Sequence, residues 1–336
     1  MIRPARAGIR RILSRPAPSL SLSPTTRPVI KAPARTPTVL IVNGAALHAR
    51  SGDGLGPFIH AGQTQTVFRS IDEIACRIEP GAARVYETVT GRDLAEFDLV
   101  QVLSHPRPTG ALLSTIADHL AHHGRPATNM AGIGTPTRIL QTMRLARAGV
   151  PVPVTVYLPE AALGSAYPVL ARTLGEPFLL TALGSFRAGE EWLIDSAAGL
   201  TGALARARRT VMAQQFIPNQ GVYRMLVMGD RVTLATGPRD LADRRAHEIS
   251  RDPDQLLDLG TLDPDASRTA VRAAQVMGYE ICAVLMIRHM LERTWHVIEA
   301  HFSPEIGAGP HPGLEIERYA AYLERRLSSD TQSEVC

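Results

Sequence analysis

The chain of 336 residues contains a single lysine, Lys31, so every basic residue that follows it is an arginine. This absence excludes chemistry that needs a lysine in the body of the protein, such as a Schiff base, a lysine general base or the phosphate-binding lysine of a P-loop. High-GC codon usage would also replace lysine by arginine without selection at any one site. Lysine chemistry is excluded from the body of the protein whether codon usage or selection removed the lysines.

Acidic residues are absent from positions 1–36, which carry eight basic residues. The remainder therefore has 28 basic against 32 acidic residues, a net charge of −4, although the whole chain carries +4. An acidic body lacks the broad basic surface of nucleic-acid-binding proteins, so we expect no nucleic-acid partner. Residues 1–36 are predicted to be a disordered basic tail or a targeting segment, because residues 1–22 can be drawn as an Arg-faced amphipathic helix.

Cysteines and long apolar runs are also scarce. Cys76, Cys282 and Cys336 fit no metal-ligand spacing, and we interpret the first two as inert core thiols of a reduced, cytoplasmic protein. No apolar run approaches the roughly 18 residues that cross a bilayer, so we expect no membrane partner. The remaining composition, 45% apolar and 20% charged, is that of an ordinary globular chain with about two domains.

The N-terminal half has the pattern of a small α/β domain. Residues 38–42 and 97–103 predict buried strands, and residues 112–122 predict a helix that ends at Gly124. We expect a partly parallel sheet from these pieces. The glycine-rich segment 51–57 lacks the spacing of a dinucleotide fingerprint and opens no helix, so we interpret it as a plain loop.

Three histidines lie at the end of the predicted helix, at His119, His122 and His123. Their spacing would let two of them share a metal ion on one helix face. Imidazoles are also favoured at a helix C-terminus by the helix dipole, and we prefer this second interpretation.

The second half has the pattern of an antiparallel α+β region. It opens with a predicted helix at residues 137–149. Gly229 and Asp230 predict a hairpin turn between two strands. A further helix is predicted at 267–277. The other predicted strands cover residues 177–182, 192–195, 211–217, 223–227, 231–235, 279–287 and 295–301.

From Asn129 to Pro304 the chain resembles, in order, the motifs of the ATP-grasp superfamily, in particular its RimK-like glutamate ligases and peptide maturases. The resemblance implies an α/β pre-ATP-grasp domain at 37–128, followed by α+β ATP-grasp subdomains at 129–212 and 213–328 and a tail at 329–336. It rests on six collinear segments, at residues 129–155, 177–189, 214–217, 223–230, 278–287 and 297–304.

This resemblance implies a function. Family members hold ATP and Mg²⁺ between two α+β subdomains, phosphorylate a carboxylate and let an amine attack the acyl phosphate. The implied partners are a nucleotide and a peptide or small-molecule carboxylate. A homo-oligomer is compatible with the sequence.

The nucleotide-binding residues are implied position by position. Arg138 stands in place of the first phosphate-binding lysine, and Thr181 stands in place of the second. Ser185 and Arg187 belong to the loop over the phosphates. The hinge strand is formed by Gln214, Gln215, Phe216 and Ile217, in which Gln215 would contact the ribose.

The metal and catalytic positions depart further from the family. Glu299 is retained, His301 replaces an asparagine and Leu285 replaces an aspartate. Glu299 and His301 would face the same side of a strand and hold any metal, although imidazole suits Mg²⁺ poorly. Arg224 is retained, and Arg239 would orient the acyl phosphate or the substrate carboxylate.

An alternative function is a pseudoenzyme, a nucleotide- or protein-binding module that keeps the fold without the reaction. Three positions that carry ionisable groups in the family are occupied here by Thr181, Val222 and Leu285, and this pattern favours the alternative.

Overall fold

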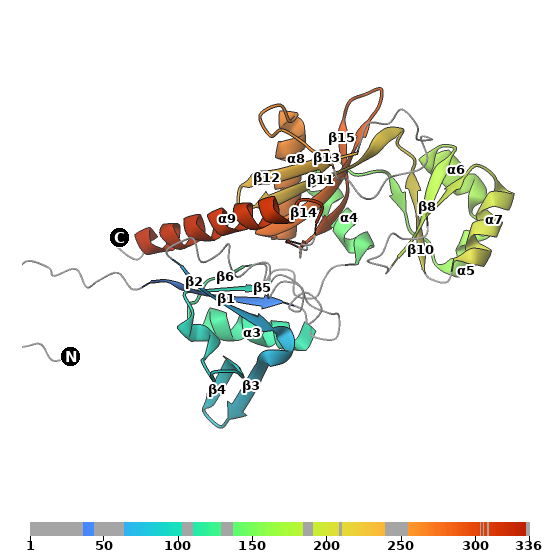
Figure 1. Cartoon of the computed structure of the whole chain (residues 1–336). Coiled ribbons are helices and arrows are strands. Elements are labelled where there is room, and N and C mark those ends of the chain that lie inside the picture. The colour runs from blue at the N-terminus through green and yellow to red at the C-terminus, as the bar shows by residue number, and fades with distance from the viewer. Residues whose placement is uncertain are drawn as a thin grey trace, which may run out of the picture. The chain divides into compact units, whose positions relative to one another are not determined.

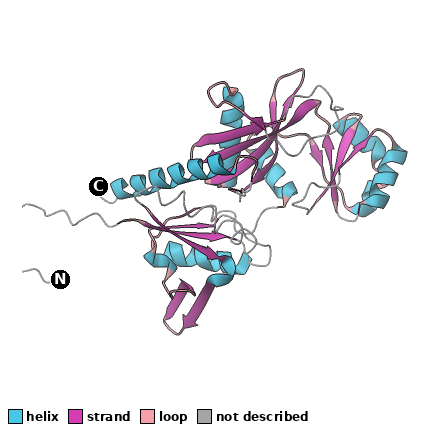
Figure 2. Ribbon diagram, in the orientation of Figure 1, coloured by secondary structure: helices cyan, strands magenta, loops and turns pink. Residues whose placement is uncertain are grey.

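The computed structural model describes residues 36–43, 64–102, 110–128, 137–183, 191–207, 210–238, 255–302, 304, 306–307 and 309–333. Within these ranges four sheets and their covering helices form the fold (Figure 1, Figure 2). None of the described helices combines the length and the apolar character needed to cross a membrane. The loop predicted at 51–57 lies outside the described residues.

The N-terminal sheet has the strand order β2-β1-β5-β6, and all its neighbouring strands are parallel. Its strands are β1 (Thr38–Asn43), β2 (Gln65–Ser70), β5 (Leu99–Val102) and β6 (Ala127–Thr128). Helix α3 (Gly110–His122) packs on one face, where Leu113 and Ile116 meet Leu40 and Val100. The predicted strands, helix and parallel pairing are therefore confirmed.

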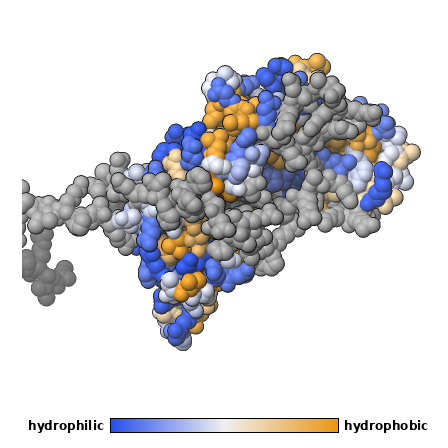
Figure 3. Space-filling model, viewed as in Figure 1, coloured by the Kyte–Doolittle hydropathy of each residue, from blue (hydrophilic) through white to orange (hydrophobic). Residues whose placement is uncertain are grey.

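Between β2 and β5 in the sequence, the chain forms a two-stranded hairpin that was not predicted. It consists of β3 (Ile74–Glu79) and β4 (Ala82–Glu87), flanked by the short 3-10 helices η1 (Ile71–Glu73) and η2 (Leu94–Glu96). Apolar side chains are exposed among charged ones over this hairpin (Figure 3), and Ile78 is 78% exposed. Cys76 is also exposed, so its interpretation as a core thiol is wrong, because an edge hairpin buries little of either face. Cys282 is buried as predicted, and burial raises the pKa of its thiol.

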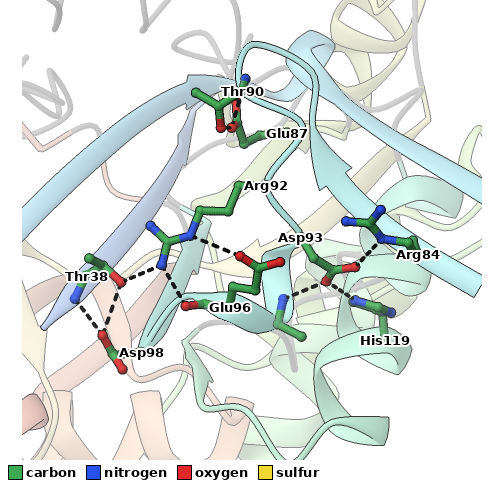
Figure 4. A network of polar contacts seen from close by, with 10 residues as sticks. Thr38, Arg84, Glu87, Thr90, Arg92, Asp93, Glu96, Asp98 and His119 are labelled. Carbon is green, nitrogen blue, oxygen red and sulfur yellow. Dashed lines mark hydrogen bonds and ion pairs between the residues drawn. The ribbon is translucent and has the colours of Figure 1, made fainter.

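A network of polar contacts joins this hairpin to α3 (Figure 4). The Asp93 carboxylate lies 2.7 Å from His119 Nε2 and accepts hydrogen bonds from Arg84 Nε at 3.2 Å and the Ala95 amide at 2.9 Å. Burial would raise the pKa of Asp93, but these hydrogen bonds outweigh it and lower the pKa. His119 is thus paired with a carboxylate, and no group of three or more potential metal ligands occurs in the described part of the chain.

The central sheet is antiparallel, with the order β7-β10-β8-β9. Leu170, Phe178 and Leu200 belong to its core. Its strands are β7 (Thr155–Val156), β8 (Phe178–Ala182), β9 (Glu191–Ile194) and β10 (Val211–Gln215), and its helices are α5 (Glu160–Leu163), α6 (Tyr167–Leu174) and α7 (Ala197–Arg206).

The C-terminal sheet is also antiparallel, with the order β13-β12-β11-β14-β15. The predicted hairpin turn at Gly229 and Asp230 is confirmed, and the strands predicted at 279–287 and 295–301 correspond to the neighbouring strands β14 and β15. The strands are β11 (Asn219–Met228), β12 (Arg231–Gly237), β13 (Gln255–Leu256), β14 (Ile281–His289) and β15 (Trp295–His301).

Helices cover both faces of this sheet. On one face, α8 (Pro264–Met277) and α4 (Arg138–Arg147) pack against Met225, Val284 and Val297. On the other face, α9 (Pro312–Ser333) packs Tyr319 and Leu323 into a cluster with Leu226, Leu234 and Ile281. The same cluster includes Val39, Ile41 and Leu99 of the N-terminal sheet, so α9 belongs to a core that β1 and β5 share.

Candidate functional site

A row of side chains crosses the C-terminal sheet on the face that α9 covers. In the strand register, Arg224 is opposite Thr236 on one side and Leu285 on the other, and Leu285 is opposite Glu299. Side chains at opposed positions share a face, and adjacent strands lie about 4.8 Å apart. Arg224 and Glu299 therefore stand two strands apart with Leu285 between them, and His301 follows in the next row.

A β-bulge in β15 determines which face of the sheet Glu299 and His301 lie on. Val297 is opposite Met286 and Glu299 is opposite Leu285, so Ile298 is an extra residue in β15. Val297 packs on the α8 face, and simple alternation would put Glu299 there as well. The bulge reverses the alternation, so Glu299 and His301 point to the α9 face instead.

Glu299 and His301 form a pair on that face. His301 Nε2 lies 3.5 Å from Glu299 Oε2, and each side chain is about 30% exposed. Both groups are thus accessible to a ligand from solvent. They are ion-paired when His301 is protonated.

Magnesium is a poor fit to the described residues of this site. Mg²⁺ takes six ligands, nearly all of them oxygen atoms. The described residues supply the Glu299 carboxylate and an imidazole, and they contain no group of three or more side chains suited to a metal. Leu285, which is opposite Glu299 and cannot ligate a metal, packs against an apolar cluster of Ile217, Val222 and Ile287.

Arg224 forms an ion pair that sequence reasoning missed. Its Nη1 lies 2.7 Å from Oε1 of Glu315, a fully buried residue in the first turn of α9. The Gly307 amide donates to the other oxygen of Glu315 at 3.0 Å. The apolar residues at 3–4 spacing after Pro312 are a signal that would have predicted α9.

Arg138 is the first residue of α4, which Thr137 caps through its side-chain oxygen. One turn later, the Gln141 amide donates to Ala300 O at 2.6 Å and accepts from Ala300 N at 2.9 Å. Ala300 lies between Glu299 and His301, so these bonds join the first turn of α4 to the strand of the candidate site. The Nε of Arg138 is buried without a hydrogen-bond partner in the described ranges.

In the central sheet, two predicted ligands are engaged in hydrogen bonds. Thr181 is buried, and its hydroxyl donates to Glu191 Oε1 at 3.4 Å. The amide of Gln214 is buried and donates to Thr155 Oγ1 at 3.0 Å, which joins β10 to β7. Gln215 is half-buried at the end of β10.

The hinge continues into the C-terminal sheet. Phe216 is half-buried and Ile217 is buried in the apolar cluster beside Leu285. The predicted ligands Ser185, Arg187 and Arg239 lie outside the described residues. The structure thus brings Arg224, Glu299 and His301 to one face of a sheet.

A second histidine shares this face. His296 is opposite Ile287, and its buried Nδ1 has no hydrogen-bond partner among the residues with a described placement. Burial lowers the pKa of His296, and His289 lowers it further. His296 is therefore held neutral near pH 7.

No protein-family model matches the chain, and no curated protein matches it. Solved structures do match. The ATP-grasp ligase PsnB, complexed with minimal precursor, has a TM-score of 0.63 at 16% identity, over 87% of this chain and 99% of that one. A RimK domain ATP-grasp protein from Sphaerobacter thermophilus has a TM-score of 0.55 at 19% identity, over 85% and 98%.

A third structure has a similar relation to this chain. A RiPP-associated ATP-grasp ligase from Chryseobacterium gregarium, in complex with ADP and a leader and core peptide, has a TM-score of 0.58 at 15% identity. It covers 88% of this chain and 97% of its own. The matches extend over nearly the full length of the solved proteins, so they reach the N-terminal parallel sheet as well as the central and C-terminal antiparallel sheets.

Proposed function

We propose that this chain, which has the ATP-grasp fold, binds ATP and uses it to join a carboxylate to an amine. The terminal phosphoryl group of ATP would pass to a carboxylate oxygen, releasing ADP. The amine nitrogen would then attack the acyl carbon, and phosphate would leave as the amide bond forms. The observation that carries the proposal is the shared face of Arg224, Glu299 and His301, which the bulge at Ile298 creates.

The proposed substrate is a peptide carboxylate. Two of the similar ligases are described with a precursor or with leader and core peptides, which supports this class over a small molecule. In the proposed site Arg138, Arg187 and Arg224 contact phosphate groups, because a guanidinium binds phosphate through two parallel hydrogen bonds. Gln215 would contact the ribose.

The other predicted ligands have lesser roles in this proposal. Ser185, Gln214, Phe216 and Ile217 would border the nucleotide, and Thr181 adds no charge to the site. Arg239 would orient the acyl phosphate. Glu299 and His301 would hold any divalent cation that accompanies ATP. We assign no step to Mg²⁺, since the described residues alone supply too few ligands for it. A cytoplasmic location remains a prediction.

Substitution of Glu299 tests the ligase. Wild-type protein is incubated with ATP, divalent cations and a pool of peptides that contain Asp, Glu and Lys, and phosphate release and loss of water from each peptide are measured. We expect turnover in the wild type and a loss of at least about 100-fold in Glu299→Ala. Glu324→Ala, at an exposed position of α9, is the matched control. Unchanged turnover in Glu299→Ala would sink the assignment.

The second candidate is a pseudoenzyme. Leu285 occupies the centre of the row between Arg224 and Glu299, inside an apolar cluster, and this observation favours it. Thermal melting with and without ATP, read together with the turnover assay, separates the ligase from the two kinds of pseudoenzyme. A ligand at 100 times its Kd stabilises the folded state by about 2.7 kcal/mol, so nucleotide binding without turnover would identify an inactive nucleotide-binding module. No shift with any nucleotide would indicate a protein-binding module.

A further inference from the structure

The ion pair of Arg224 and Glu315 joins β11 to the first turn of α9. The Arg224 side chain is 13% exposed and that of Glu315 is fully buried. A buried carboxylate is costly unless an opposite charge and hydrogen bonds compensate it. Glu315 therefore depends on Arg224 for its charge balance, and Arg224 is held at one end by Glu315.

The Glu315 carboxylate is itself fixed from two further sides. Its Oε2 accepts the Gly307 amide at 3.0 Å. Gly309 lies so close that a Cβ there would overlap Glu315 Oε1 and would be 2.8 Å from its Cδ. The φ of Gly309 is not in the positive region, so the close approach to Glu315 is the main restriction on a side chain at this position.

The guanidinium keeps hydrogen-bonding capacity beyond this pair. Arg224 donates to Glu315 through Nη1. Across the described ranges Arg224 makes no other hydrogen bond or ion pair. An arginine fork offers five N–H donors, so an anion can bind through Nε and Nη2 while Nη1 stays with Glu315. The fork lies on the same face as Glu299 and His301.

We infer that Glu315 is a positioning residue, which orients Arg224 so that the free edge of its guanidinium binds the terminal phosphoryl group of the nucleotide. This inference rests on the proposed nucleotide site and adds to it a residue outside the resembling motifs. Glu315 acts through Arg224 and does not itself contact the nucleotide.

The test compares two carboxylates that hold α9. Glu315→Gln removes the charge beside Arg224, and Glu280→Gln removes the charge beside Arg326, whose Nε lies 2.9 Å from Glu280 Oε1. Calorimetry measures the Kd of each variant for AMPPNP, which has a terminal phosphate group, and for ADP, which lacks it. We expect Glu315→Gln to weaken AMPPNP binding about tenfold more than ADP binding. We expect Glu280→Gln to leave the ratio of the two Kd values unchanged.

A second variant displaces Glu315 without removing its charge. Gly309→Ala forces the carboxylate away from its position, so we expect the same selective loss of AMPPNP affinity. Gly313→Ala is the matched control, because a Cβ at Gly313 meets no atom within 4 Å. This pair decides the question if Glu315→Gln does not fold.

The outcomes are separable. A merely structural role of Glu315 would lower the melting temperature and weaken both nucleotides equally, so an unchanged Kd ratio in Glu315→Gln and in Gly309→Ala overturns the inference while nucleotide binding stands. Absence of nucleotide binding by the wild type overturns both the inference and the proposed function.

Discussion

Replacing Leu285 by aspartate should add a second carboxylate beside Glu299 and so strengthen divalent-cation binding at a position where the described residues contain no group of three possible ligands. Leu285 is opposite Glu299 on the neighbouring strand, where Cβ atoms of directly opposed residues are about 4.5–5.5 Å apart. Two carboxylates at this separation can ligate one cation through their oxygen atoms. We expect Leu285→Asp to bind Mg²⁺ more tightly than the wild type.

The change also has a cost that the structure allows us to estimate. Leu285 is partly buried against Ile217, Val222, Ile287 and Ile298. Losing about half of a leucine's burial costs about 1 kcal/mol, and like charges opposite each other cost up to about 1 kcal/mol more. Without metal the variant should therefore melt several degrees lower, at about 2–4 °C per kcal/mol. Mg²⁺ at 100 times its Kd would stabilise the folded variant by about 2.7 kcal/mol, which exceeds the stability that the substitution removes.

Thermal melting across a MgCl₂ titration measures both effects. Leu285→Asn is the matched control, since it loses the same packing without adding a charge. We expect Mg²⁺ to raise the melting temperature of Leu285→Asp by several degrees and to leave Leu285→Asn unchanged. Equal responses of the two variants, or no response of either, would refute the argument that these opposed positions form one cation site.

Two further predictions concern stability. Burial would raise the pKa of Glu87, but hydrogen bonds from Thr90 and Arg69 lower it from 4.5 to about 2. The charged form therefore stabilises the folded state above about pH 4.5 and loses this contribution as the pH falls toward 2. Urea midpoints should thus show Glu87→Gln less stable than the wild type at pH 7, with the difference shrinking by pH 3; a constant difference would contradict this. Gln141→Leu should lower the free energy of unfolding in urea by about 2–4 kcal/mol, because the Ala300 amide and carbonyl lose their buried partner. A loss below about 1 kcal/mol would show that the Gln141–Ala300 hydrogen bonds contribute little to stability.

The elements with strong local signals were predictable from the sequence. The β-branched run of β1 and the Gly229–Asp230 turn between β11 and β12 follow from neighbouring residues alone, and the structure confirms them. The β3–β4 hairpin was missed, and Cys76 on it was wrongly assigned to the core. Its strand Ile74–Glu79 is mostly exposed, so apolar residues there do not report burial.

The face of the candidate site was only half predictable. Spacing predicts that Glu299 and His301 share a side of their strand. It cannot say which side, because alternation from Trp295 and Val297 would send both side chains toward α8. The extra residue Ile298 depends on how β15 pairs with β14, which is a property of the assembled sheet. Glu315 was missed for a related reason, since its contact with Arg224 spans 91 residues of sequence.

The near-absence of lysine takes on a physical meaning at Arg224. An ammonium group is a compact charge whose donors radiate from one nitrogen, whereas a guanidinium presents separate edges in a fixed plane. Only the guanidinium can give one nitrogen to a buried carboxylate and a different edge to an anion without moving. At Arg138 the described residues show no comparable pair for the buried Nε, which has no hydrogen-bond partner among them. Codon bias explains arginine at either position. In the proposed site, however, only a guanidinium at position 224 could bind Glu315 and an anion at the same time, so a lysine at position 224 would lose one of the two contacts.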